Sequence, residues 1–269
     1  MHPDWLIPDW PAPDGVRALF TTRQGGVSAV PFDSLNLGDH VGDVPAQVAE
    51  NRRLLGQALG AAPVFLQQVH GTQVLALDGH TAQGLPADAV ITTQRGVACT
   101  IMVADCLPVL FSTLDGSAVA AAHAGWRGLA GVRGRGVLEQ TYESFWALAQ
   151  AGRAQSAMDT IAWLGPCIGP AAFEVGAEVR AAFVDSDAEA AYCFTPLGGG
   201  KYLADLAGLA RLRLQAMGIT QVYGNNSSAP WCTVGNASRF FSHRRDAGVH
   251  GNGNGFNTTG RMAACIWLA

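Results

Sequence analysis

Charged residues are scarce in this 269-residue chain, and they make up only 14% of it. That is well below the quarter or so of a typical globular protein. Hydrophobic residues make up 49%, which is enough for a sizeable core at this length. Low charge with high hydrophobicity excludes disorder over most of the chain.

The sequence also lacks an excess of positive charge. Its 17 basic and 21 acidic side chains leave a net charge of -4. A general nucleic-acid binder needs a basic surface, so we expect no nucleic-acid partner. Because the overall field does not attract anions, a small anionic substrate would need local arginines.

No stretch of the sequence has the features of a signal peptide or a membrane helix. The N-terminus carries aspartate and proline where a signal peptide needs basic residues and an apolar run. The apolar stretch from Val97 to Phe111 is interrupted by Asp105 and Pro108 and is too short to span a bilayer as a helix. We therefore expect a cytoplasmic protein without a membrane partner, whose six cysteines stay reduced.

Internal repeats and linker-like segments are also missing, which predicts one domain over residues 1–269. Hydrophobic periodicity and turn residues predict an α/β arrangement of strands flanked by helices. The Gly/Asn-rich segment 248–260 is expected to be a loop, acting as a lid or being a simple insertion. Helices are predicted over 45–59, 134–151, 176–183 and 203–217, and strands over 16–22, 64–69, 73–77, 89–93, 98–103, 109–112, 118–122, 161–164, 221–223, 240–241 and 263–268.

Three residues able to bind a metal each follow a predicted strand and precede a turn. His70 lies in the phrase Gln67-Gln-Val-His-Gly, Cys106 lies in Val103-Ala-Asp-Cys-Leu-Pro, and His123 lies in Ala121-Ala-His-Ala-Gly. Strand ends commonly carry functional sites. Two histidines and one thiolate leave one position of a tetrahedral zinc ion open, which is typical of catalytic zinc sites. Without metal, Cys106 is a candidate nucleophile with His123 or His70 as its base.

Spacing alone leaves simpler interpretations open. A single buried cysteine is usually a small hydrophobic residue, and no CxxC or HxxxH motif links these three side chains. The other five cysteines have no histidine nearby in the sequence and are interpreted as structural. Asp105, next to Cys106, is a candidate to orient a ligand histidine or to carry protons, although strand alternation can point it away.

Arginines beside glycines are the candidate anion-binding residues. Arg127 lies in Gly125-Trp-Arg-Gly and Arg23 precedes Gly25-Gly26, so each could clamp a phosphate or carboxylate in bidentate fashion. A salt bridge or a solvated loop explains them equally well. Trp126 could stack on a base, although core packing explains most tryptophans. A second basic cluster, Arg244, Arg245 and Arg261, surrounds the Gly/Asn-rich segment.

These phrases, with others along nearly the whole chain, resemble the YfiH-like family. The family is also labelled multicopper polyphenol oxidoreductase (laccase), peptidoglycan-editing factor and purine nucleoside phosphorylase. Further matching phrases are Thr21-Thr-Arg-Gln-Gly-Gly-Val-Ser, Ser34-Leu-Asn-Leu-Gly, Gly165-Pro-Cys-Ile-Gly-Pro, Phe241-Ser-His-Arg-Arg-Asp and Thr259-Gly-Arg. The sequence departs from the family pattern at His243, where a tyrosine is usual, and in extra residues between Asp246 and Thr259.

The resemblance implies a four-layer α/β/β/α domain with mixed sheets, similar to the catalytic domain of cytotoxic necrotizing factor toxins. It implies that His70, Cys106 and His123 form a catalytic metal site, with zinc as the expected cofactor and copper possible. It implies phosphorolysis of adenosine, inosine, guanosine and methylthioadenosine, with adenosine deamination as a further activity. We expect Arg23, Asn36 and Arg127 to bind the nucleoside and phosphate in a monomer or homodimer.

Three other functions stay open at this point. A copper polyphenol oxidase fits the soft ligands, but a laccase needs many clustered histidines and this chain has only seven, poorly clustered. A thiol hydrolase or amidase that edits a peptidoglycan precursor would use Cys106 with His123. A metal sensor or partner-binding protein would use the same three residues without turnover.

Overall fold

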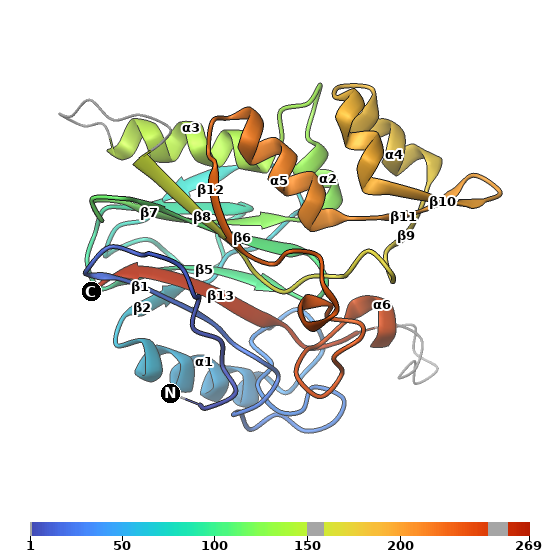
Figure 1. The fold of residues 1–269 in the computed structure, drawn as a ribbon. Helices are drawn as coiled ribbons and strands as arrows, with labels where there is room; N and C mark the ends of the chain where they lie inside the picture. The colour runs from blue at the N-terminus through green and yellow to red at the C-terminus, as the bar shows by residue number, and fades with distance from the viewer. Residues whose placement is uncertain (1, 150–158, 247–257) are drawn as a thin grey trace.

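A computed structural model describes residues 2–149, 159–246 and 258–269 of the chain (Figure 1). Its two larger sheets lie one above the other between helices. The α-helices are α1 (Pro45–Leu59), α2 (Trp126–Ala130), α3 (Val137–Ala149), α4 (Ala177–Val184), α5 (Leu206–Ala216) and α6 (His243–Asp246), and the 3-10 helices are η2 (Ala188–Cys193) and η3 (Ala229–Trp231).

The strands form three sheets with mixed or antiparallel pairing. The four-stranded sheet has the order β1-β13-β5-β2, made of β1 (Val16–Phe20), β13 (Met262–Leu268), β5 (Val97–Val103) and β2 (Ala62–Val64). The six-stranded sheet has the order β12-β8-β6-β7-β4-β3, made of β12 (Gln221–Gly224), β8 (Thr160–Leu164), β6 (Leu107–Thr113), β7 (Val119–Ala124), β4 (Ala89–Thr92) and β3 (Val74–Ala76). A small sheet joins β10 (Phe194–Gly198), β11 (Lys201–Ala204) and β9 (Glu174–Gly176).

Three hydrophobic clusters fill the spaces between four layers. One cluster lies between α1 and the four-stranded sheet and includes Leu55 and Trp267. A second lies between the two sheets and includes Ile101 and Leu110, and a third lies between the six-stranded sheet and helices such as α3, which contributes Phe145. Figure 1 shows the same order, with α1 below the sheets and α3 and α5 above them. The α/β prediction is confirmed, while the likeness to the toxin domain stays a prediction.

The chain crosses between the two large sheets at four places, from β2 to β3, β4 to β5, β5 to β6 and β12 to β13, and two of these crossings position the site. These two are the crossing from β2 to β3 and the crossing from β5 to β6. The crossing from β5 to β6 is the turn Ala104–Cys106, in which Asp105 has a positive φ of 89°. Strands in different sheets must diverge at such a turn, so side chains on the two crossings can meet at one end of the sheet pair.

Most predicted elements are confirmed, and the differences lie at their ends. Helix α1 has the predicted bounds. Helix α5 begins at Leu206 rather than Leu203, because the Asp205 side chain accepts a hydrogen bond from the Gly208 amide and caps the helix there. Helix α3 begins at Val137, where the Glu139 carboxylate accepts from the Gly136 amide.

Two predicted strands are wrong. Residues 65–69 form no ladder after β2, although Phe65 and Leu66 are buried. The Gln68 side chain replaces the ladder there, accepting from the Met102 amide and donating to the Met102 carbonyl. Phe240 is also outside any strand, and its ring packs edge-on against Phe20. Burial of two adjacent large hydrophobic residues, Phe65 with Leu66 and Phe240 with Phe241, produced the strand-like pattern in both cases.

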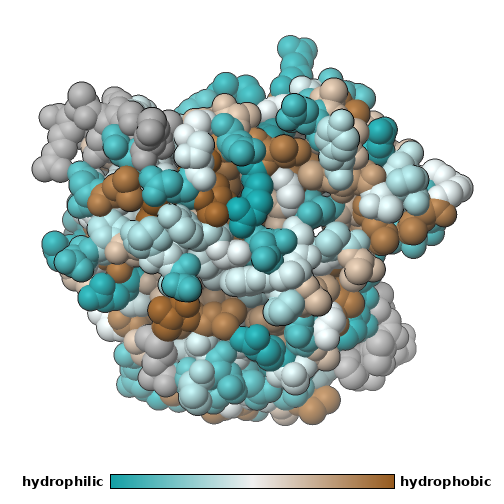
Figure 2. Space-filling model, viewed as in Figure 1, coloured by the Kyte–Doolittle hydropathy of each residue, from teal (hydrophilic) through white to brown (hydrophobic). Residues whose placement is uncertain are grey.

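The surface and the cysteines agree with the composition. Figure 2 shows hydrophobic residues scattered among hydrophilic ones on the visible face, some of them at the edge where Figure 1 places the β10–β11 hairpin. All six cysteines are free. Within the described ranges, no helix has both the length and the hydrophobicity that a bilayer crossing requires. Most of the predicted loop 248–260 lies outside the described residues.

Candidate metal centre and its pocket

His70, Cys106 and His123 meet at the end of the sheet pair, as the sequence predicted. His70 lies on the crossing between β2 and β3, Cys106 lies on the crossing between β5 and β6, and His123 lies in β7. Their candidate ligand atoms all lie within 4.8 Å of one another. The Sγ atom of Cys106 is 3.8 Å from Nε2 of His70, and the two imidazole centroids are 4.8 Å apart. The three side chains can therefore share one ion.

Two backbone features make room for this convergence. His70 has a positive φ of 58°, a conformation that costs energy for a residue with a side chain and is common at functional sites. Gly125 approaches so closely that a Cβ atom there would lie 2.9 Å from the His70 ring and 3.1 Å from the Cys106 sulfur. A larger residue at Gly125 would push the imidazole and the thiolate aside.

Asp88, which the sequence reasoning did not single out, holds two of the three ligands. It is fully buried just before β4, and its Oδ1 lies 2.8 Å from Nδ1 of His123. The same carboxylate accepts the backbone N–H groups of His70 (2.9 Å) and Gly71 (2.6 Å). Because Nδ1 of His123 is engaged, its Nε2 is the nitrogen left for a metal.

Opposing charges keep Cys106 and His123 ionised in the metal-free protein. Burial alone raises the pKa of Cys106, but the charges and hydrogen bonds of His123 and His70 outweigh it and lower that pKa to about 6. Burial alone lowers the pKa of His123, but Cys106 and Asp88 raise it to about 9. Burial also raises the pKa of Asp88, and the His123 hydrogen bond then brings it below its usual value.

The donor set fits a divalent metal. A thiolate, two imidazoles and a carboxylate that orients one imidazole form the ligand and support pattern of zinc sites. Within the described ranges, these residues are the one group of three or more His, Cys, Asp or Glu side chains close enough to hold an ion. The geometry offers three candidate ligands, and all three side chains line one cavity.

That cavity has a volume of about 370 Å³, a size typical of small-molecule sites. One wall is apolar and includes Trp126, Ile168 and Phe173. The rest combines the three candidate ligands with further polar and basic groups. The full lining is His40, Gln68, His70, Met102, Val103, Ala104, Asp105, Cys106, His123, Trp126, Ile168, Phe173, Leu206, His243, Arg244 and Arg261.

The predicted substrate residues Arg23 and Asn36 do not line this cavity. The Arg23 guanidinium donates to the carbonyl and carboxylate of Asp33 and to the Ala237 carbonyl. Asn36 is fully buried and joins Gly38, Asp43 and the amide of Arg261 through its side chain. Both residues brace loops around the cavity, and direct contact with substrate stays a prediction.

Arg127 also lies outside the cavity lining. Its guanidinium stacks on Trp126 at 4.5 Å from the ring centroid, on short helix α2, and its side chain is exposed. Trp126 itself does line the cavity. Trp126 also packs against the hydrophobic core. Stacking of Trp126 on a base and phosphate binding by Arg127 both stay predictions.

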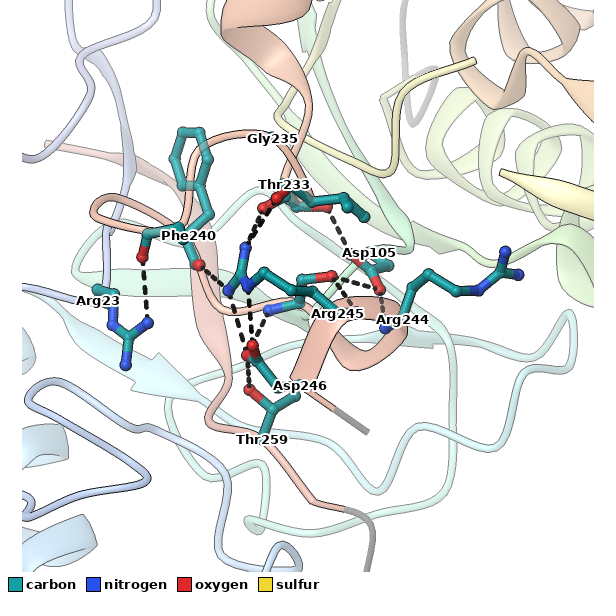
Figure 3. Close-up of polar contacts among 12 residues, drawn as sticks. Arg23, Asp105, Thr233, Gly235, Phe240, Arg244, Arg245, Asp246 and Thr259 are labelled. Atoms are coloured by element: carbon teal, nitrogen blue, oxygen red, sulfur yellow. Dashed lines mark hydrogen bonds and ion pairs between the residues drawn. The ribbon is translucent and has the colours of Figure 1, made fainter. Parts of the chain in front are cut away.

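Asp105 ties the Cys106 turn to residues 233–244 (Figure 3). We call this segment the closing loop, because His243 and Arg244 on it line the cavity. Its carboxylate accepts hydrogen bonds from Thr233 Oγ1 (2.5 Å), Ser242 Oγ (3.1 Å) and the Arg244 amide (2.6 Å). It contacts neither ligand histidine, so the structure assigns the orienting role to Asp88 and gives Asp105 a loop-anchoring role.

Comparisons with known proteins cover nearly the whole chain. Residues 17–269 match the family model described as multi-copper polyphenol oxidoreductase laccase. The chain is 50% identical over 265 residues to a purine nucleoside phosphorylase of Pseudomonas aeruginosa and 48% identical to purine nucleoside phosphorylase YfiH of Escherichia coli, with 98% of each chain covered. A crystal structure of a Neisseria meningitidis protein of family DUF152 superimposes with a TM-score of 0.84 at 44% identity, covering 98% of this chain and 99% of that one. The chain therefore belongs to the YfiH (DUF152) family.

Proposed function

We propose that this protein is a zinc-dependent purine nucleoside phosphorylase. The observation that carries the proposal is the joining of three metal donors to one cavity of small-molecule size with an aromatic wall. Near full-length similarity to purine nucleoside phosphorylases supports the same reaction class. The substrates we propose are adenosine, inosine, guanosine and methylthioadenosine, with inorganic phosphate.

The apolar wall is the proposed site of the purine. Trp126 and Phe173 present aromatic surfaces to the cavity, and stacking on such rings is favourable for any purine. The ribose would then lie toward the polar end that carries His70, Cys106 and His123. This arrangement puts the glycosidic bond close to the charged half of the cavity.

His70, Cys106 and His123 would hold the zinc ion, which supplies Lewis-acid chemistry when bound. The Cys106 thiolate would provide the negative charge, and Asp88 engages Nδ1 of His123, which would leave Nε2 to bind the metal. In phosphorolysis, a phosphate oxygen forms the new bond to ribose C1′ while the bond from C1′ to the base nitrogen breaks. The purine leaves with the electron pair, and the proton of the phosphate reaches it through solvent.

Adenosine deamination is a further activity we propose for the same cavity. It needs a group that moves protons near the amine, and His40 and His243 line the cavity without being ligands. Burial, followed by the nearby Arg261 charge, lowers the pKa of His40, which favours its neutral, proton-accepting form. Replacing His40 by glutamine is expected to reduce ammonia release more than phosphorolysis.

The test uses purified zinc-loaded protein with inosine and phosphate, followed by chromatography of the bases and assay of ribose 1-phosphate. Stoichiometric hypoxanthine and ribose 1-phosphate are expected. The variant Cys106→Ser should lose zinc and this activity, while Cys193→Ser, outside the cavity, should keep both. Absence of phosphorolysis with each of the four nucleosides in a zinc-loaded protein would contradict the proposal.

The same material separates the other candidate reactions. A thiol hydrolase would keep its activity after removal of metal by a chelator and lose it in Cys106→Ser. A polyphenol oxidase would oxidise a phenol after copper loading. We expect neither result. Against the oxidase, the described residues offer a single cluster of metal donors, whereas a multicopper oxidase needs several copper ions.

A further inference from the structure

Arginines around the cavity differ in what their guanidinium groups contact. Arg244 donates to the carbonyls of Ala172 and Glu174, and it stacks near Phe173. Arg245 is paired with Asp246 and donates to several backbone carbonyls (Figure 3). Arg23 is paired with Asp33. Each of these groups therefore already has protein acceptors around it.

Arg261 leaves more of its guanidinium free than these three arginines do. Its Nη1 donates to the carbonyls of Thr259 and Gly260, but neither Nε nor Nη2 makes a hydrogen bond within the described residues. No carboxylate there forms an ion pair with it, and residues 150–158 and 247–257 contain no Asp or Glu. A largely buried cation without a carboxylate partner is costly, so such a group usually receives an anion from elsewhere.

The backbone directs Arg261 toward the metal centre. It immediately precedes β13, whose first residue Met262 pairs with Val103 in β5, so Arg261 lies opposite the turn that leads to Cys106. Its amide is fixed by the Asn36 side chain. Its stem passes over Gly38, where a Cβ atom would lie only 2.7 Å from Arg261 Cγ. The backbone of Arg261 and the first part of its side chain are therefore fixed by contacts within the protein.

The charge around Arg261 also favours an anion. Arg244 lines the same cavity and adds a second positive charge, and the nearby negative groups are already engaged. Asp105 accepts hydrogen bonds from three donors in the closing loop, and the Cys106 thiolate belongs to the proposed metal centre. Burial lowers the pKa of Arg261, and the negative charges of Cys106 and Asp105 oppose that effect.

We propose that Arg261 binds the phosphate ion, presenting Nε and Nη2 to two of its oxygens beside the metal centre. This inference rests on the proposed phosphorylase reaction for its biological meaning, but the anion site stands on the geometry of Arg261. The planar guanidinium matches two phosphate oxygens at once, which a lysine cannot do. The proposal gives to Arg261 the role that the sequence suggested for Arg23 and Arg127.

The test compares Arg261→Gln, Arg261→Lys and the control Arg180→Gln, whose guanidinium stacks on Tyr202 and lies outside the cavity lining. Calorimetric titration of the zinc-loaded proteins with inorganic phosphate measures binding without turnover. Phosphate KM and kcat with inosine are measured on the same samples, and zinc content is checked in each. Arg261→Gln is expected to weaken phosphate binding and raise phosphate KM at least about tenfold, with a smaller change in inosine KM.

Arg261→Lys should fall between the wild type and the glutamine variant, and Arg180→Gln should match the wild type. If Arg261→Gln does not fold, the lysine variant decides, and unchanged phosphate affinity in it overturns the proposal. Wild-type protein that binds no phosphate also overturns it. If Arg261→Gln catalyses phosphorolysis with an unaltered phosphate KM, this inference alone is refuted. If phosphate binding depends on Arg261 but no phosphorolysis occurs, the proposed phosphorylase reaction is refuted and the phosphate site at Arg261 is kept.

Discussion

Asp88 and His123 form a buried pair, with Oδ1 of the carboxylate 2.8 Å from Nδ1 of the imidazole. The same carboxylate accepts the backbone N–H of His70, so one side chain fixes two of the three candidate ligands. Carboxylates that orient a ligand histidine typically change metal affinity 10–100-fold when they are replaced. Asp88 therefore links the strand framework to the metal centre.

Replacing Asp88 by asparagine is expected to weaken zinc binding by about 10–100-fold. The amide cannot carry the negative charge that stabilises the His123 ring, and it loses acceptor capacity toward the His70 and Gly71 amides. Competition with a calibrated chelator measures the affinity. The exposed residue Asp9 provides the control Asp9→Asn, and equal zinc affinity in both variants would contradict this role.

The Cys106 thiol should titrate near pH 6 in the metal-free protein, because His123 and His70 outweigh the effect of burial on its pKa. Its alkylation rate by iodoacetamide should therefore rise through that range and be nearly constant by pH 8. Cys193, whose pKa burial raises to about 11, should react slowly throughout. Mass spectrometry identifies the alkylated residue.

Removing the Asp88 carboxylate, which supports the positive charge of His123, should raise the pKa of Cys106 again. In Asp88→Asn, the Cys106 alkylation profile is expected to move to higher pH, because the imidazolium that lowers the thiol pKa has lost its partner. A profile that stays in place would show that the thiolate does not depend on this pair.

Asp105 is expected to contribute to stability by joining the Cys106 turn to the closing loop. Asp105→Asn keeps the size of the side chain but weakens the contacts with Thr233, Ser242 and the Arg244 amide (Figure 3). Loss of buried charge-assisted hydrogen bonds should cost about 1–3 kcal/mol in the free energy of unfolding. Urea denaturation measures it, with exposed Asp14→Asn as the control that should change little.

Asp246 should make stability depend on pH in the acid range. Burial alone raises the pKa of Asp246, but Arg245, the Thr259 hydroxyl and the Ser242 amide outweigh it and lower that pKa. A carboxyl whose folded pKa is depressed stabilises the fold above its unfolded pKa of about 4, and this contribution disappears as pH falls through the folded value.

The stability difference between wild type and Asp246→Asn should therefore be largest near neutral pH and shrink as pH falls below about 4. Thermal or urea unfolding of both proteins between pH 3 and pH 7 measures it. A difference that grows with acidity would reverse the expected sign and exclude this explanation.

Local sequence determined the elements that depend on short-range periodicity and capping. Helix α1 follows from Pro45 and the spacing of its apolar residues, and strands β5, β6 and β7 follow from continuous buried runs. The three candidate metal ligands could be found because each lies beside a turn next to a predicted strand. The family resemblance then grouped them, which spacing alone did not.

Only the tertiary structure decided which distant residues support that centre. Asp88 lies 18 residues from His70 and 35 from His123 along the chain, so no local pattern connects them. The cavity-facing placement of Arg261 depends on the pairing of β13 with β5, whose residues are more than 150 positions apart. Charged side chains that come to one site from separate strands and loops are brought together by sheet register and packing, which are properties of the whole fold.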